Sequence, residues 1–218
     1  MIPVTIIADT VSAGDAEVIT SWFELLVKGG FIMIPILLLS LFSVYLFFDR
    51  FSYIRQATKI DNKLVDTVLL EMRNSNISRA IQYAQNDNTS MGKILLNGLN
   101  MVGKPIQEIE SHIESTTNLE ITKMEKDMGY LGIIAGIAPM LGFIGTISGV
   151  IKIFYNISLA DNISIGIIAG GLYQKMICSG AGLIVGVIAY SCYHYLHLKI
   201  DRYSIRLQET LLKFFKEL

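Results

Sequence analysis

The side chains that could do chemistry are few, and they lie within long apolar runs. Residues 163–198 contain no acidic residue, yet Gln174 and Lys175 stand side by side there. A lysine within a membrane span costs about 2.5–3.5 kcal/mol on insertion scales, so it needs a counter-charge, a water-filled cavity or a route to the membrane surface. Lys175 follows Asp161 by 14 residues, about 21 Å of helix, so its ammonium reaches that surface only if the third span begins outside the bilayer. The default reading of such a residue is an ion path or a counter-ion to an acid of another protein.

The hydroxyl groups of Thr146 and Ser179 lie in similarly apolar runs. At 100° per residue, one side of the run 128–151 carries Ala135, Ala138, Gly142, Gly145, Thr146 and Gly149. One side of the next run carries Ser164, Gly171, Lys175, Ser179, Gly182 and Gly186. Small residues let membrane helices approach closely, and Pro139 predicts a kink. The alternative to an ion path at Thr146 is a hydroxyl that bonds back to the Gly142 carbonyl.

Composition favours an integral membrane protein. Of 218 residues, 52% are hydrophobic and 17% charged, and the mean hydropathy is +0.49, whereas soluble domains average about 25% charged. Basic residues are dispersed rather than gathered in a stripe, which argues against nucleic-acid binding. No Ser/His pair, paired aspartates or metal motif lies at span depth, so we expect neither an enzyme nor a bound metal or cofactor.

The cysteines and two of the histidines have structural readings. Cys178 and Cys192 would lie about 21 Å apart on one helix, too far for a disulfide, so both are expected to be packing residues. His194 and His197 are spaced i, i+3 at a helix end. We interpret them as an interfacial pair rather than as metal ligands.

Three runs are long enough to span a bilayer, which takes about 20 apolar residues. The predicted organisation is an N-terminal segment 1–28, spans 29–48, 128–151 and 163–190, a helical region 49–127, a loop 152–162 and a C-terminal helix 191–218. The first segment lacks the basic start of a secretory signal and is expected to be partly helical from Asp15. The fold class is therefore all-α, with three transmembrane helices.

Charge sets the expected orientation. Residues 50–127 carry ten Lys and Arg and residues 199–218 carry five, whereas the first segment holds only Lys28 and the loop only Lys152. Cytoplasmic loops collect Lys and Arg, so the N-terminus is expected outside and the C-terminus inside. Helical spacing within 64–74, 78–86 and 90–102 predicts short cytoplasmic helices, with a turn at 86–88. Pro105 is expected in the first turn of a long helix that continues toward the second span.

Residues 28–51, 138–154 and 170–189 resemble the three spans of the MotA/TolQ/ExbB proton-channel family, and most closely its ExbB and TolQ branch. The resemblance rests on the Lys-Gly-Gly…Pro-Ile entry and on the Pro…Gly-x-x-Gly-Thr…Gly pattern of the second span. It implies a multi-pass stator subunit of the bacterial inner membrane, with a periplasmic N-terminus. Such subunits form a homo-oligomer, usually a pentamer, around a single-span ExbD- or TolR-like partner, and proton flow there drives a TonB- or TolA-like protein.

The resemblance also implies roles for particular residues and shows one departure. The family's hydroxyl positions fall on Thr146 and on Ser179, where threonine is usual. The proton-carrying aspartate belongs to the partner. The third span often has a glutamate where this chain has Gln174, and a small or apolar residue where it has Lys175. We therefore expect these four residues to form the ion path or partner interface, with Lys175 paired to the partner's aspartate or to another carboxylate of the complex.

Two other functions remain open at this stage. The same physics could drive a gliding or secretion motor. Alternatively, the small-residue faces could serve packing alone, in a membrane scaffold that conducts nothing. Packing and kinking are in any case the expected roles of Pro139, Gly142, Gly145, Gly149, Gly182 and Gly186.

Overall fold

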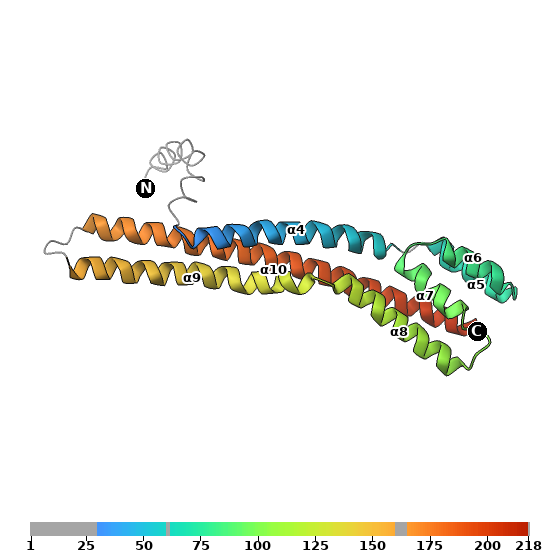
Figure 1. The fold of residues 1–218 in the computed structure, drawn as a ribbon. Coiled ribbons are helices and arrows are strands. Elements are labelled where there is room, and N and C mark those ends of the chain that lie inside the picture. Colours follow the sequence, from blue (N-terminus) through green and yellow to red (C-terminus); the bar gives the residue numbers. More distant parts are fainter. Residues whose placement is uncertain (1–29, 60–61, 160–164, 218) are drawn as a thin grey trace, which may run out of the picture. The chain divides into compact units, whose positions relative to one another are not determined.

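The computed structural model describes residues 30–59, 62–159 and 165–217, and every regular element in these ranges is a helix (Figure 1). The helices are α4 (Met33–Ala57), α5 (Asn62–Arg73), α6 (Ile77–Gln85), α7 (Ser90–Leu99), α8 (Ile106–Glu125), α9 (Met128–Ser158) and α10 (Ile165–Lys216). Three stretches within these ranges, namely α4, the α8–α9 region and most of α10, are long and apolar enough to cross a membrane. The predicted fold class is confirmed. The helix expected from Asp15 lies outside the described residues.

The chain divides into two compact units. The first, here called the apolar unit, comprises residues 30–43, 133–159 and 165–190 in its described part. The second, called the charged unit, comprises residues 44–132 and 191–217, apart from residues 60–61. Lys152 and Lys175 are the charged side chains among the described residues of the apolar unit. Each unit has its own way of packing helices together.

In the apolar unit, α9 and α10 approach each other at glycines. A methyl group at Gly182 would lie 2.5 Å from the carbonyl oxygen of Ala138 and 3.1 Å from the Cα of Gly142. A methyl group at Gly186 would lie 2.5 Å from the ring of Pro139. Backbone therefore packs against backbone, as predicted from the small-residue faces. We call this contact the glycine seam and assign to it Ala138, Pro139, Gly142, Gly145, Gly149, Gly182 and Gly186.

The outward faces of the apolar unit are hydrophobic. Phe143, Met140 and Leu183 expose 62%, 64% and 57% of their surface, whereas Ala138 and Cys178 expose none. This arrangement, with large apolar side chains outside and small residues at the helix contact, is the reverse of that in a water-soluble domain. It suits a lipid environment, in which helices are held together by close packing. This face pattern is the one expected of helices that pack together within a membrane.

The charged unit has an ordinary hydrophobic core. Its fully buried side chains include Ile54, Met91, Ile94, Leu95, Leu99, Ile113, Met124, Leu196 and Phe214. Gly98 of α7 lies so close to Ile113 of α8 and Phe214 of α10 that a methyl group there would meet them at 2.7 Å and 3.1 Å. The amphipathic helices α5, α6 and α7 match the three that helical spacing predicted, within a few residues at each end.

The long helix predicted after Pro105 is present as α8, but a break that was not predicted separates it from the second span. The helix after Pro105 does not continue into the second span, because α8 ends at Glu125 and α9 begins at Met128. Asp127 between them has a φ of +61°, a left-handed conformation that a helix interior does not allow. The carboxylate of Asp127 lies 3.4 Å from the guanidinium of Arg50, so an ion pair holds the break against α4. Pro105 itself directly precedes the first helical residue.

Candidate functional site

The two predicted hydroxyl residues both lie at the glycine seam. Ser179 of α10 is half-buried, and its Cα would be 3.0 Å from a methyl group on Gly142 of α9. Thr146 lies one turn after Gly142 and is also half-buried. Cys178, the buried neighbour of Ser179, fills the space beside Gly145, where a methyl group would lie 2.9 Å from its sulfur. The seam therefore brings these predicted residues of α9 and α10 into one contact region.

The Thr146 hydroxyl bonds to its own helix, but not to the Gly142 carbonyl that we named as the alternative to an ion path. It donates to the carbonyl oxygen of Phe143 at 2.7 Å, three residues back, rather than to Gly142. A hydroxyl that donates its hydrogen still has lone pairs with which to accept a hydrogen bond. The Thr146 hydroxyl can therefore accept a hydrogen bond from water or from a protonated carboxyl group without losing its own bond to the helix.

Lys175 lies one turn before Ser179 on α10, and its stem crosses Gly149 of α9. A methyl group at Gly149 would overlap the Lys175 side chain, and the three atoms nearest to it are Cγ, Cδ and Cε of that lysine. The ammonium nitrogen lies 3.7 Å from the position of a methyl group on Gly30, just before α4. Lys175 is half-buried, and no ion pair or hydrogen bond joins its ammonium to another described residue.

Some predicted residues stay without a structural description. The backbone of Gln174 belongs to α10, but its side chain is outside the described part of the structure, and so is the whole of Ser164. The roles expected for them therefore remain predictions. Both cysteines are free thiols, Cys178 buried and Cys192 half-buried, in keeping with packing roles.

Aromatic and charged side chains gather in the charged unit near the start of α9. Lys199 places its ammonium 4.2 Å from the ring centre of Phe51 and 5.2 Å from that of Tyr195, and these two rings stack. His197 stacks on Tyr193, and its Nδ1 lies 4.0 Å from a carboxylate oxygen of Glu125. Rings, lysines and histidines at the ends of apolar helices are typical of a membrane–water interface. The interfacial reading of His197 fits this arrangement.

A buried acid in the charged unit was missed by the sequence analysis. Glu120 of α8 exposes only 4% of its side chain, accepts a hydrogen bond from the Ser90 hydroxyl at 2.9 Å and pairs with Lys123 at 2.7 Å. Burial alone would raise the pKa of Glu120, but the bonds from Lys123 and Ser90 outweigh it and lower the pKa below its usual range. The available signal was the spacing, because Glu120 follows Ile113 by seven residues on the buried face of its helix.

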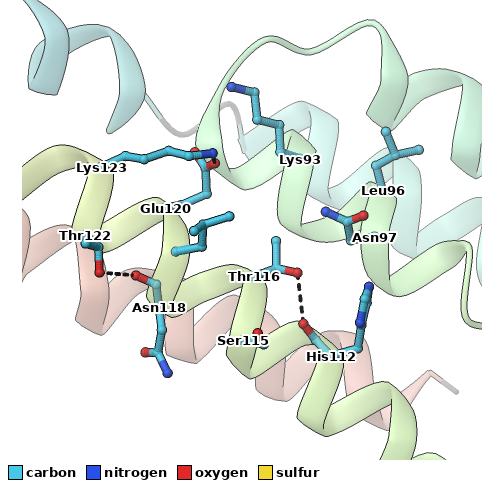
Figure 2. A pocket seen from close by; sticks show the side chains of 11 residues that line it. Lys93, Leu96, Asn97, His112, Ser115, Thr116, Asn118, Glu120, Thr122 and Lys123 are labelled. Carbon is cyan, nitrogen blue, oxygen red and sulfur yellow. Dashed lines mark hydrogen bonds and ion pairs between the residues drawn. The ribbon is translucent and has the colours of Figure 1, made fainter.

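An open cavity of about 670 Å³ adjoins this acid between α7 and α8 (Figure 2). Lys93 and Lys123 border it together with Asn97, and the Thr116 hydroxyl donates to the His112 carbonyl in its wall (Figure 2). In the ranges that the structure describes, no three His, Cys, Asp or Glu side chains are close enough to hold a metal ion. The cavity is open to solvent, and both polar and apolar side chains line it.

The fold and the seam define a class of protein, a multi-pass helical membrane protein with two hydroxyls at a close helix–helix contact. The profile of the MotA/TolQ/ExbB proton channel family matches residues 86–209, more than half of the chain, which therefore belongs to that family. The predicted family is confirmed. The matched range runs from just before α7 to near the end of α10, so it includes Thr146, Lys175 and Ser179.

Individual relatives carry names from the ExbB and TolQ branch. The chain is 27% identical over 161 residues to an "ExbB-like 3" biopolymer transport protein of Synechocystis sp., an alignment that covers 73% of this chain and 77% of that protein. It is 27% identical over 84 residues to the Tol-Pal system protein TolQ of Haemophilus influenzae, covering 38% and 37% of the two chains. It is 25% identical over 87 residues to the biopolymer transport protein ExbB of Salmonella typhimurium, covering 40% and 36%.

Proposed function

We propose that the chain is the inner-membrane stator subunit of a proton-motive-force-driven motor. In this proposal it forms a ring, expected to be a pentamer, around an ExbD- or TolR-like single-span partner and energises a TonB- or TolA-like protein. The work would serve transport across the outer membrane or its integrity. Membership of a proton channel family and relatives named ExbB and TolQ support the proposal. The charge pattern supports a periplasmic N-terminus and a cytoplasmic C-terminus. The expected action is transport, not enzymatic catalysis.

The main support for the proposal is that the glycine seam has hydroxyl groups but no acidic side chain among the described residues. Thr146 and Ser179 are half-buried polar groups at the glycine seam, and the described residues of the apolar unit include no Asp or Glu. Hydroxyls can pass a proton along hydrogen bonds, but they do not ionise at neutral pH. The group that takes up and releases the proton would therefore come from the partner, whose carboxyl group would move past these hydroxyls.

Removing one hydroxyl tests this role. We expect Thr146→Val, which keeps the shape of the side chain, to lower proton flux through the complex in proteoliposomes by about tenfold, the effect of one lost hydrogen bond of about 1.4 kcal/mol in the transition state. Ser158→Ala is the matched control, because the Ser158 hydroxyl also donates to a carbonyl three residues back in α9, that of Tyr155 at 2.7 Å. Equal fluxes for the two variants would argue against an ion path at Thr146.

A non-conducting scaffold is the second candidate, and the glycine seam is the observation that favours it. Close backbone packing alone explains why Gly142 and Gly182 are glycines. The bond that the Thr146 hydroxyl donates to the Phe143 carbonyl within α9 is compatible with the scaffold as well. A complex that assembles normally but passes no protons down an imposed pH gradient would favour the scaffold.

A further inference from the structure

The side chain of Lys175 occupies the space left by the absence of a side chain at Gly149. Its stem lies over Gly149, where any Cβ would overlap it, so the lysine is directed along α9 and not toward the outward apolar faces. Long helical side chains lean toward the N-terminus of their own helix, which for α10 is the end nearest the α9–α10 connection. The contact with Gly30 agrees with this direction. The position of the ammonium is thus set by the packing of the apolar unit.

The contact with Gly30 gives the depth of that ammonium. Gly30 stands at the start of the first apolar run, with a φ of +78° in the turn before α4. Ten residues of α10 precede Lys175 and nine residues of α9 follow Gly149, about 15 Å and 14 Å of helix beyond this level. The two helices therefore extend past the level at which the first span begins, and Lys175 lies near the membrane surface.

Residue counts along the helices support this level as one boundary of the membrane. Arg50 is the first basic residue after the first apolar run, and Tyr195 belongs to a group of stacked rings of the kind found at a membrane interface. Twenty residues separate Gly30 from Arg50, and twenty separate Lys175 from Tyr195. About twenty apolar residues are the number that a helix needs to cross the hydrocarbon core. We infer that the third span begins near Lys175 rather than at residue 163. The ammonium of Lys175 can then reach the membrane surface.

The described part of the apolar unit offers this ammonium no counter-charge. The described residues of the apolar unit hold two cations and no acid. Lys152 is exposed to solvent or lipid, whereas Lys175 is half-buried against α9 and the start of α4. A lipid phosphate readily meets a lysine on an outward face, but here it would have to enter beside the seam. A carboxylate on a helix that packs along the seam reaches Lys175 more directly.

We propose that Lys175 binds a carboxylate of a partner membrane helix at the outer end of the glycine seam. Ser179 lies one turn deeper on α10, about 6 Å further into the membrane. The acid that meets Lys175 is therefore a second carboxylate, distinct from one that exchanges protons at the depth of Thr146 and Ser179. This ion pair would fix the height of the partner helix in the ring, so Lys175 is a positioning residue. The inference rests on the proposed function in one respect, that a partner helix lies along the seam.

Zero-length cross-linking tests the contact. A membrane-permeant carbodiimide joins a lysine to a carboxylate only when the two groups touch, and peptide mass spectrometry then identifies both residues. In the purified complex of the chain with its co-expressed partner, we expect Lys175 to be joined to an acid near the outer end of the partner's span. We expect no such product at Lys152, the matched lysine of α9. A Lys175 product with Asp161 or Glu24 of this chain, or no Lys175 product at all, would overturn the proposal.

Substitutions separate this inference from the proposed function. Lys175→Met should lower retention of the partner on native mass spectrometry about tenfold and make it insensitive to salt, whereas Lys175→Arg should retain it and Lys152→Met should leave it unchanged. If Lys175→Met instead removes bound phospholipid and leaves the partner in place, a lipid occupies the site and the proposal is wrong. If partner retention depends on Lys175 but flux does not depend on Thr146, the docking proposal stands and the proposed function fails.

Discussion

The two units of the chain solve the same packing problem with different groups. In the apolar unit, contact between α9 and α10 relies on glycines, so that backbone meets backbone at Gly142 and Gly182. In the charged unit, helices enclose large side chains such as Phe214, and a hydrogen bond from Ser90 of α7 to Glu120 of α8 joins two of them. Water drives large apolar side chains together, but lipid does not, so membrane helices depend on close approach. Helices α9 and α10 have residues in both units, so they pack by close backbone approach in the apolar unit and by enclosing large side chains in the charged unit.

The largest effect should come from breaking the glycine seam. A methyl group at Gly182 meets the Ala138 carbonyl at 2.5 Å and the Gly142 backbone at 3.1 Å, and backbone atoms cannot move aside as a flexible side chain can. We expect Gly182→Ala to destabilise the protein in detergent by about 1–3 kcal/mol, the usual cost of overpacking, measured as a lower melting temperature.

Gly180→Ala is the matched control for this change. Gly180 lies two residues earlier in the same helix, and a methyl group there would meet nothing within 4 Å. Alanine is also the better helix former, so this variant should be as stable as the parent or slightly more stable. If both variants lowered the melting temperature equally, close backbone approach would not be what holds α9 to α10.

A smaller effect is expected in the charged unit, at its buried acid. Glu120→Gln keeps the size of the side chain but weakens its bonds to Ser90 and Lys123, which should cost about 1–2 kcal/mol. Hydrogen exchange should report the loss as faster exchange in α7 and α8, with little change in the apolar unit. Glu114→Gln, at an exposed position of α8, should leave exchange unchanged. Faster exchange in both variants would mean that removing charge from α8, not losing the buried pair, is responsible.

The same acid gives the charged unit a dependence on pH. The pKa of Glu120 is lower in the folded protein than its usual value of about 4.3, so an unfolded chain binds the proton more readily. The stabilisation is therefore fully present above about pH 4.3 and is lost as the pH falls through the folded-state pKa. Burial and, to a lesser extent, the nearby Glu120 carboxylate raise the pKa of Tyr203. This tyrosine is therefore neutral at every pH at which Glu120 titrates. In Glu120→Gln the acid-induced loss of stability should be smaller than in the parent.

Sequence reasoning predicted the apolar unit better than the charged one. Three spans and two small-residue faces follow from length and helical spacing, because glycine has few roles in a span other than close approach. The break at Asp127 was missed, since its left-handed conformation is stabilised by Arg50, which lies 77 residues away in the chain. The Thr146 acceptor was wrong by one residue, because spacing alone does not decide between bonds to the third and fourth preceding carbonyls. The contact between Lys175 and Gly30 joins residues far apart in the chain, so no local pattern contains it.

In the proposed function, protons pass the hydroxyls at the glycine seam. It is tested most directly by proton flux in proteoliposomes that contain the complete complex, under an imposed pH gradient, with the double substitution Thr146→Val and Ser179→Ala. Native mass spectrometry of the same preparation establishes that the ring and its partner are intact. We expect an intact complex whose flux falls to the level of empty vesicles. An intact complex that conducts protons as fast as the parent would contradict it.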